Sequence, residues 1–169
     1  MKWTRIICES SEKFAVGLTK DEVLDILDSV DTSQNTRYNR NNFMKYLKYG
    51  TGKEVYCGLI DAEGNCTALS VVETGNPKSG YCFLLEVQSF DKGAGSRLIQ
   101  NLIGKYRRLW LMADPSADEN LVGYYRRPEF GFSEYVVDKS GYGGALHVFY
   151  TSACDSELIE ATSDENWSK

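Results

Sequence analysis

Apolar residues in this chain follow two spacings, and the longer spacing predicts the helices. Thr19 and Glu22 form the pattern of a capping box, and apolar residues then follow at every third or fourth position as far as Val30. Pro128 ends a later segment with the same spacing, because proline cannot continue a helix. Helices are therefore expected over residues 20–30, 42–49, 94–106 and 118–127.

Shorter apolar runs, separated by glycine, asparagine and aspartate, predict strands. The run Tyr81–Val87 is almost wholly apolar, which is typical of a strand covered on both faces. The order of strands and helices along the chain predicts an α+β sheet that carries helices on both faces. Strands are expected over residues 3–9, 54–60, 66–73, 81–87, 108–113, 133–137 and 145–151.

The length and the charge predict one domain followed by an acidic tail. A chain of 169 residues is long enough to bury a core of its own. The net charge is −5, and the segment 152–169 holds five acidic residues against one lysine, so residues 1–151 are close to neutral. We therefore expect a domain over 1–151 and a solvated tail over 152–169, with a short helix over 155–161 as an alternative. The near-neutral domain argues against a nucleic-acid partner.

Composition excludes several other classes of protein and site. The sequence shows neither a membrane span nor a secretory signal, so we expect a cytoplasmic protein with no membrane partner. Five cysteines and one histidine, His147, have no spacing typical of a disulfide framework or a zinc site, and we expect no metal. The cysteines are interpreted as small apolar residues, and His147 as a structural residue of a late strand.

The segment Phe90–Gly95 joins an apolar strand to a helix through two glycines. A tight turn at a helix N-terminus directs several backbone N–H groups at one point, beside the positive end of the helix dipole. Glycine lets the backbone approach an anion where a Cβ atom would clash. The turn predicts a phosphate or pyrophosphate site; the alternative is a turn whose glycines serve packing alone. Neither the Rossmann motif nor the P-loop motif is present.

Two motifs give the chain a resemblance to the GNAT acyltransferase superfamily over about residues 3–151. The turn Phe90-Asp-Lys-Gly-Ala-Gly95 resembles the family's Gln/Arg-x-x-Gly-x-Gly/Ala motif, with Phe90 in place of Gln or Arg. The segment Tyr124–Phe132 resembles the family's Phe-Tyr-x-x-x-Gly-Phe helix end, with about two extra residues. The resemblance implies a mixed, mostly antiparallel central sheet of about seven strands, with helices on both faces.

The same resemblance implies acetyl-CoA as the cofactor, and it places coenzyme A along the strand and the turn. The backbone of Leu85 and Val87 would lie along the pantetheine arm, where this strand of the family diverges from its parallel neighbour. Asn120 would touch coenzyme A from the start of the next helix. The residues expected around the pyrophosphate are Asp91, Lys92, Gly93, Ala94, Gly95, Ser96 and Arg97.

Transfer of an acetyl group to an amine needs a base for the ammonium proton and an acid for the leaving thiolate. Glu86 is the single charged residue of its strand segment, and alternation places it on the face opposite to Leu85 and Val87. It is the expected base, with an ion pair on one face of the sheet as the alternative. The resemblance implies Tyr125 as the acid; Tyr124, or a purely structural aromatic residue, is the alternative.

These inferences predict an acetyl-CoA-dependent N-acetyltransferase that moves an acetyl group directly to a primary amine in a ternary complex. The acceptor would be a small molecule or a peptide, bound between the first two helices and the loops over 75–80 and 139–144. The resemblance also allows a homodimer formed through the last strands. The rival functions are a non-catalytic GNAT-like interaction protein and a toxin-like enzyme that acetylates aminoacyl-tRNA.

Overall fold

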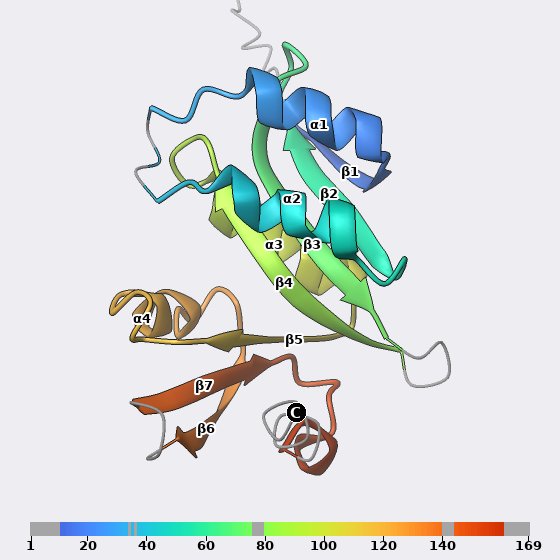
Figure 1. Ribbon diagram of the computed structural model, residues 1–169. Helices are drawn as coiled ribbons and strands as arrows, with labels where there is room; N and C mark the ends of the chain where they lie inside the picture. Colours follow the sequence, from blue (N-terminus) through green and yellow to red (C-terminus); the bar gives the residue numbers. More distant parts are fainter. Residues whose placement is uncertain (1–10, 34, 36, 76–79, 140–143, 161–169) are drawn as a thin grey trace, which may run out of the picture.

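The computed structural model describes residues 11–33, 35, 37–75, 80–139 and 144–160, which form a seven-stranded sheet with helices on both faces (Figure 1). The order across the sheet is β1-β2-β3-β4-β5-β7-β6. The strands are β1 (Lys13–Leu18), β2 (Glu54–Ile60), β3 (Cys66–Thr74), β4 (Tyr81–Ser89), β5 (Arg108–Ala113), β6 (Ser133–Lys139) and β7 (Gly144–Tyr150). The helices are α1 (Lys20–Ser29), α2 (Arg40–Tyr49), α3 (Ala94–Lys105) and α4 (Leu121–Tyr125), and residues 156–160 are also helical.

Neighbouring strands of the sheet are antiparallel, with the exception of β4 and β5. β4 and β5 run parallel because α3 carries the chain back from the end of one strand to the start of the other. The predicted α+β class and the mixed, mostly antiparallel sheet of seven strands are therefore confirmed.

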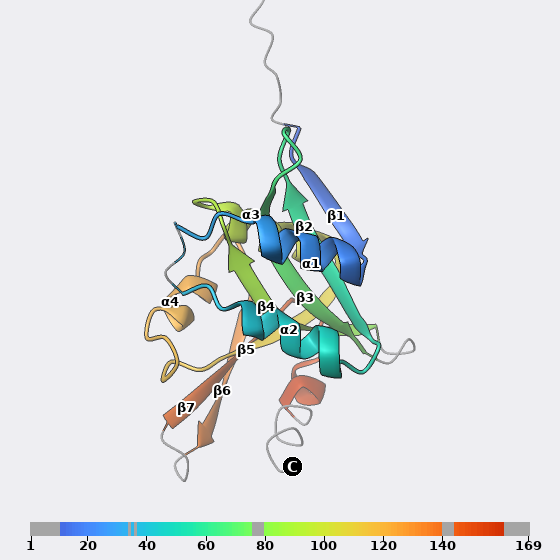
Figure 2. The same cartoon turned by 45° about the horizontal axis from the view of Figure 1, so that its top comes forward.

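The helices form two layers, with α1 and α2 on one face of the sheet and α3 on the other (Figures 1 and 2). The first face buries the α2-side core, in which α1 and α2 pack on Leu69 and Val71 of β3. The second face buries the α3-side core, in which α3 and α4 pack on Val72 and Leu84. Val71 and Val72 enter different cores because successive side chains of a strand point to opposite faces.

The first two helices begin as the sequence predicts. The Oγ1 atom of Thr19 accepts a hydrogen bond from the Glu22 amide at 3.2 Å, and the Glu22 carboxylate accepts one from the Thr19 amide at 2.7 Å. Asn39 caps α2 by accepting a hydrogen bond from the amide of Asn41. These caps satisfy amides that have no partner inside the helix, so both helices lie within two residues of their predicted bounds.

The edge strand β1 is absent from the predicted elements. The strand expected over 3–9 lies outside the described residues. β1 lacks a clean alternation of apolar and polar residues, and its register against β2 shifts next to Gly17, which has a φ of 77°. Its hydrogen-bonding partner lies about forty residues further along the chain, where Phe14 faces Leu59. Pairing with β2, rather than local pattern, makes this segment a strand.

The fourth helix is shorter than the expected range 118–127, because aspartate side chains compete for the amides in front of it. Asp114 and Asp118 accept hydrogen bonds from the backbone amides of Ser116 and Asn120, each at 2.9 Å. Such local bonds offer the backbone an alternative to the helix. The segment before α4 therefore folds as a series of turns, and residues of these turns line the candidate functional site.

The segment that follows β7 packs back onto the sheet. Ile159 is 1% exposed and belongs to a cluster with Trp110, Leu146 and Val148. The helix over 156–160 agrees with the alternative of a short helix, and up to residue 160 the tail is not a solvated extension. Residues 161–169 lie outside the described part of the chain, and the boundary at residue 151 stays a prediction.

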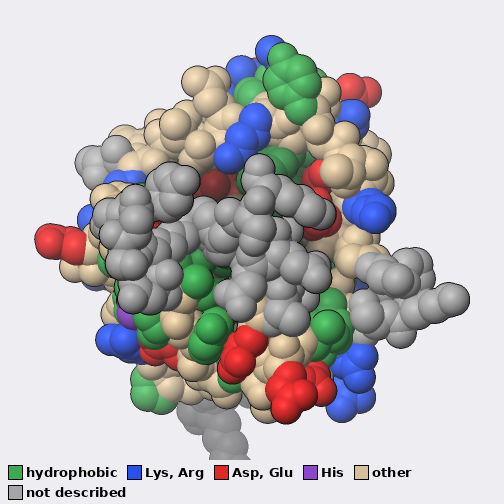
Figure 3. Space-filling model, turned by 60° about the horizontal axis from the view of Figure 1, so that its bottom comes forward, with side chains coloured by type: hydrophobic (Ala, Val, Ile, Leu, Met, Phe, Trp, Pro, Cys, Tyr) green, Lys and Arg blue, Asp and Glu red, His purple; other side chains and the backbone are tan. Residues whose placement is uncertain are grey.

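Charged side chains of both signs are mixed on the face of the molecule drawn in Figure 3. On this face, lysine and arginine side chains are scattered among acidic ones instead of forming one basic patch.

In the part of the chain that the structure describes, every helix is too short or too polar to cross a bilayer.

Candidate functional site

The site is a cleft that opens where β4 and β5 separate. The two strands pair only at their first residues, from Tyr81 opposite Arg108 to Phe83 opposite Trp110. Beyond Phe83 each strand keeps its other neighbour, β3 or β7, and a cleft of about 1390 Å³ lies between the two arms. Its lining includes residues of α2, β4, β5 and α4, together with the loop before α2, the turns before α4 and the start of α3, so the cleft reaches both faces of the sheet. The divergence of the two strands agrees with what the resemblance implied.

A β-bulge in β4 decides which side chains enter the cleft. Val72 faces Leu84 and Val71 faces Glu86, so Leu85 is an extra residue without a partner on β3. Leu85 packs on the α2-side core, while Val87 packs on the α3-side core. Strict alternation had placed Glu86 opposite to both residues. This expectation is wrong for Leu85, because the bulge interrupts the two-residue repeat.

Glu86 lies half-buried in the cleft wall formed by β4. Its Oε1 atom accepts a hydrogen bond of 2.5 Å from the side-chain amide of Gln88. Burial raises the pKa of the Glu86 carboxyl, against the opposing effects of Gln88, of Lys45 and of the Asn42 amide. None of the ion pairs among the described residues involves Glu86, so the alternative of an ion pair on the sheet face is not observed.

Tyr125 forms part of the opposite wall of the cleft, on α4. It is 6% exposed, and its ring belongs to a cluster with Tyr124, Phe130, Phe132 and Phe149. Burial raises the pKa of the Tyr125 hydroxyl. The residue is thus both a core aromatic and a lining residue, and its hydroxyl stays protonated over the physiological range.

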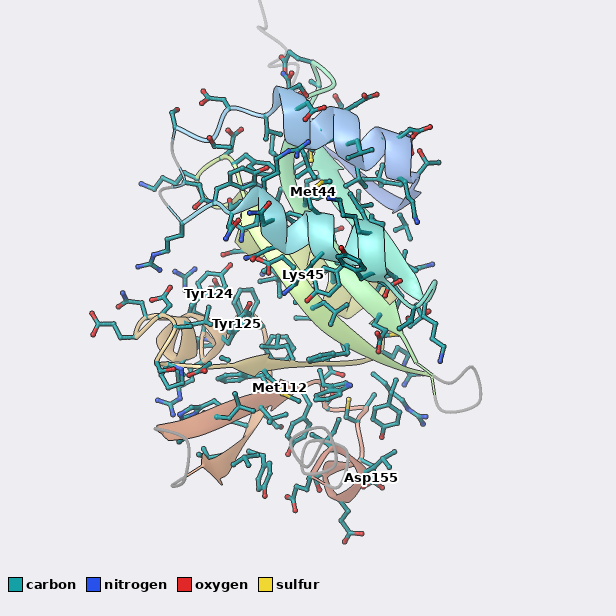
Figure 4. The ribbon with its side chains drawn as sticks, viewed as in Figure 1. Met44, Lys45, Met112, Tyr124, Tyr125 and Asp155 are labelled. Carbon is teal, nitrogen blue, oxygen red and sulfur yellow. The ribbon has the colours of Figure 1, made fainter. Side chains whose placement is uncertain are left out.

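Tyr124 and Tyr125 differ in what their hydroxyls contact. In Figure 4 both side chains lie between α4 and β4, and Lys45 lies on the α2 side of the same opening. The Tyr124 hydroxyl is 3.0 Å from the Oγ atom of Ser96, at the start of α3. Tyr124 is thereby held against the glycine turn, whereas no hydrogen bond between Tyr125 and a described side chain is seen.

Arg127 is a residue of the site that the sequence reasoning missed. Its guanidinium lies 4.6 Å from the centre of the Tyr124 ring and donates a hydrogen bond of 3.2 Å to Ser96 Oγ. The Oε1 atom of the neighbouring Glu129 carboxylate lies 3.6 Å from Nη1 of Arg127. The spacing of three residues from Tyr124 to Arg127 was an available signal, since such residues share a face of the helix expected over 118–127. In the structure α4 ends at Tyr125, and Arg127 reaches the site from the segment just after it.

The turn between β4 and α3 has the geometry of an anion site at a helix N-terminus. Gly93 caps α3 in the left-handed conformation, with a φ of 78°, which favours glycine. A Cβ atom on Gly95 would lie 3.1 Å from the Cβ atom of Ser89, so this glycine also permits a close approach of the helix to β4. The conformation of Gly93 and the close approach at Gly95 thus give each glycine a structural reason, and the use of the turn as an anion site stays a prediction.

The amides of this turn divide into two groups. The amides that donate a hydrogen bond within the protein are those of Asp91, Ala94 and Gly95. Among the described residues, no acceptor is found for the amides of Lys92, Gly93 and Ser96. A group of amides without acceptors at the N-terminus of a helix is suited to bind an anion.

The structure brings only part of the predicted site residues into the cleft. Phe90 is 3% exposed and packs in the α2-side core, with its ring edge-on to Tyr38, so it does not line the cleft. Arg97 is held by Glu12 through two hydrogen bonds of 3.0 Å. The predicted residues that line the cleft are Leu85, Glu86, Val87, Gly95, Asn120 and Tyr125; Asp91, Lys92, Gly93, Ala94, Ser96 and Arg97 form the adjoining turn and the start of α3.

His147 lies away from the cleft, and most of the two loops expected to border the acceptor lies outside the described residues. The Nδ1 atom of His147 is 2.6 Å from Glu134, which Arg126 holds through two hydrogen bonds of 2.8 Å. His147 does not line the cleft. Residues 76–79 and 140–143, expected to border the acceptor, lie outside the described residues. Within the described residues, no group of histidine, cysteine or acidic side chains is placed to hold a metal ion.

Solved structures that resemble this one over most of its length include acetyltransferases. GCN5 from Tetrahymena has a TM-score of 0.56 and 14% identity, over 85% of this chain and 98% of that chain. A structure described as histone acetyltransferase HPA2 and related acetyltransferase, from Corynebacterium glutamicum, has a TM-score of 0.55 and 14% identity, over 86% and 98%. An acetyltransferase of the GNAT family from Staphylococcus aureus has a TM-score of 0.51 and 12% identity, over 82% and 99%.

The likeness covers almost the whole of those chains, and the fold of this protein is that of the GNAT acetyltransferases. At such low identities the likeness concerns the fold. No protein-family model matches the sequence, and no curated protein does so either.

Proposed function

We propose that this protein is an acetyl-CoA-dependent N-acetyltransferase, which transfers an acetyl group directly to the primary amine of a small molecule or a peptide. One observation carries the proposal: the parting of β4 and β5 forms a cleft with Glu86 and Tyr125 in its walls and the glycine turn at its end. A carboxylate, a neutral hydroxyl and an anion site are the groups that this reaction needs.

The end of the cleft at the glycine turn has the groups to bind a diphosphate. The amides of Lys92, Gly93 and Ser96 lack acceptors among the described residues, and they lie at the positive end of the α3 dipole. Arg127 adds a cation beside Ser96. Phe90 stands where the family motif has Gln or Arg, and its ring is turned into the core. We infer that the Arg127 cation compensates for that missing polar side chain. When bound, acetyl-CoA would supply an activated acetyl group as a thioester.

The unpaired edge of β4 is suited to hold an extended ligand. From Leu84 onward, β4 has no neighbour on the side of β5, so backbone groups of Leu85 and Val87 face the cleft without a strand partner. Buried backbone groups of this kind need a hydrogen-bonding partner. An extended pantetheine arm with two amide groups would satisfy them, as an added strand does at a sheet edge.

Glu86 and Tyr125 are proposed as base and acid. Glu86 would take the proton of the acceptor ammonium at its carboxylate, and burial raises its pKa toward the range in which it can exchange a proton. Tyr125 would give up its hydroxyl proton to a leaving thiolate, and burial keeps that hydroxyl protonated until then. Tyr124 is the weaker candidate because Ser96 engages its hydroxyl.

Ligand binding is the first test of the proposal. At a hundredfold excess over Kd, acetyl-CoA should stabilise the protein by about 2.7 kcal/mol, which raises the melting temperature by about 5–10 °C. Scanning fluorimetry measures this shift. No shift at millimolar acetyl-CoA would contradict the proposal and leave only the fold.

Turnover is the second test. Glu86→Gln and Tyr125→Phe should each lower kcat by about 10²–10⁴ with little change in the Kd of coenzyme A. Glu63→Gln in an exposed turn and Tyr49→Phe, where the tyrosine is 84% exposed, are the matched controls and should keep wild-type rates. Release of coenzyme A with a panel of amines measures the rate. Wild-type rates in both cleft variants would remove these two roles.

One observation favours a second candidate, a GNAT-like protein that acts through protein contacts without catalysis. Three amides of the turn, those of Asp91, Ala94 and Gly95, already donate hydrogen bonds within the protein. Gly95→Asp would place a carboxylate at the cleft end and abolish binding of coenzyme A. A partner interaction that survives this change, in a protein that never binds acetyl-CoA, would support the second candidate.

A further inference from the structure

A chain of two side-chain amides leads from the loop between α1 and α2 to Glu86. The Nδ2 atom of Asn35 is 3.1 Å from Oε1 of Gln88, and Nε2 of Gln88 is 2.5 Å from Oε1 of Glu86. Asn35 Nδ2 also lies 2.8 Å from the carbonyl oxygen of Ser89. All three side chains line the cleft.

The donor and the acceptor of each hydrogen bond between these side chains follow from backbone groups that can only donate or only accept. The amide of Arg37 can only donate, and it lies 3.0 Å from Oδ1 of Asn35. The carbonyl of Ser89 can only accept, so Nδ2 of Asn35 must face it. Gln88 must therefore present Oε1 to Asn35 and Nε2 to Glu86. An ionised carboxylate accepts hydrogen bonds only, and the chain thus ends in a donor that matches the ionised form.

Resting on the proposed function, we propose that Gln88 and Asn35 are positioning residues: together they hold Oε1 of Glu86 in place and favour the ionised form that accepts a proton from the acceptor amine. Gln88 contacts the base, and Asn35 fixes the orientation of the Gln88 amide. Neither residue needs to touch the acceptor amine or the reacting atoms.

The surroundings of Glu86 explain why such a donor is needed. Burial disfavours its charge, and the neighbouring residue on β3, Val71, offers no polar group. From α2, Lys45 and the amide of Asn42 favour the charge, and from α4 the hydroxyl of Tyr125 faces the same space. The Gln88 amide donates the hydrogen bond of 2.5 Å to Oε1 of Glu86. Without it, a larger share of Glu86 would be protonated near neutral pH and unable to act as a base.

The test replaces the amide and follows the protonation of Glu86 directly. Gln88→Met keeps the length of the side chain and removes the donor, Asn35→Ala removes the residue that orients it, and Gln100→Leu on the exposed side of α3 is the control. Carbon-13 NMR titration of the Glu86 carboxyl reports its pKa without any need for activity. The dependence of kcat/KM on pH reports the same group during turnover.

We expect the Glu86 titration and the acidic limb of the kcat/KM profile to move to higher pH in Gln88→Met, and by less in Asn35→Ala. On the acidic limb, Gln88→Met should lose about tenfold in kcat/KM, as expected for one hydrogen bond to a charged group. Gln100→Leu should match the wild type.

A Glu86 titration that is unchanged in Gln88→Met would overturn the inference, even if the rate fell equally at every pH, because that result indicates a structural role. An unchanged titration in Asn35→Ala would overturn the part assigned to Asn35. If the titration moves as expected but the wild type transfers no acetyl group, the proposed function fails while the positioning of Glu86 stands.

Discussion

Ile159 offers a sharp test of how the C-terminal segment contributes to the fold. Its side chain is 1% exposed and packs with Trp110, Leu146 and Val148, on the sheet region formed by β5 and β7. Ile159→Ala would remove buried carbon atoms and leave a cavity, which costs about 3 kcal/mol at a fully buried site. For a chain of this size, the melting temperature should then fall by about 6–12 °C.

The neighbouring Leu158 is the matched control, because it is 45% exposed. Leu158→Ala should cost less than about 0.5 kcal/mol, as surface substitutions usually do. Urea unfolding at pH 7 measures both variants, with m-values compared to confirm that the unfolded states are alike. Equal costs for the two variants, or no cost for Ile159→Ala, would refute the packing of residues 156–160 on the sheet and would restore the solvated tail.

Three further predictions address the proposed cofactor site and the stability of the fold. Arg127→Gln should raise the Kd of coenzyme A about tenfold, because one charge-assisted hydrogen bond is lost. The control Arg126→Gln should leave that Kd unchanged. Calorimetry measures both values, and an equal loss of affinity in the two variants would exclude Arg127 from the site. The hydrogen bond from Arg126 lowers the pKa of Glu134 to about 2, so this carboxylate stabilises the fold fully above pH 4.5 and loses that effect as pH falls toward 2. Urea midpoints of Glu134→Gln should lack this acid-dependent loss, and identical pH dependence in both proteins would contradict it. Gly93→Ala should cost about 1 kcal/mol because alanine is strained at positive φ, and an unchanged urea midpoint would count against that conformation.

Much of the geometry of the candidate site could be predicted because its signals are local. The turn at Gly93 needs a residue that accepts positive φ, and glycine in front of a helical pattern indicates such a turn directly. The single charge of Glu86 in an apolar strand marked it as unusual without any knowledge of its neighbours. The capping box of Thr19 and Glu22 likewise acts over three residues, and α1 begins where it predicts.

Other parts of the site could not be predicted, because they depend on residues far apart in the chain. The bulge at Leu85 exists only in the register between β3 and β4, and no property of Leu85 itself indicates it. Phe90 stood where the family motif has a polar residue, and only the packing of α1 and α2 reveals that its ring enters the core. Asn35 reaches Gln88 across fifty-three positions of sequence.

The sequence by itself determined most of the helices and strands, their order, and the turn that opens α3, because helix caps, glycine conformations and apolar periodicity act over a few residues; the edge strand β1 is the exception, since pairing with β2 makes it a strand. Tertiary structure alone decided where β4 and β5 part, which face Leu85 takes, and which polar groups surround Glu86. Those features depend on the pairing and packing of distant segments, whose free energy is gained only when the segments meet, so no local pattern in the chain records them.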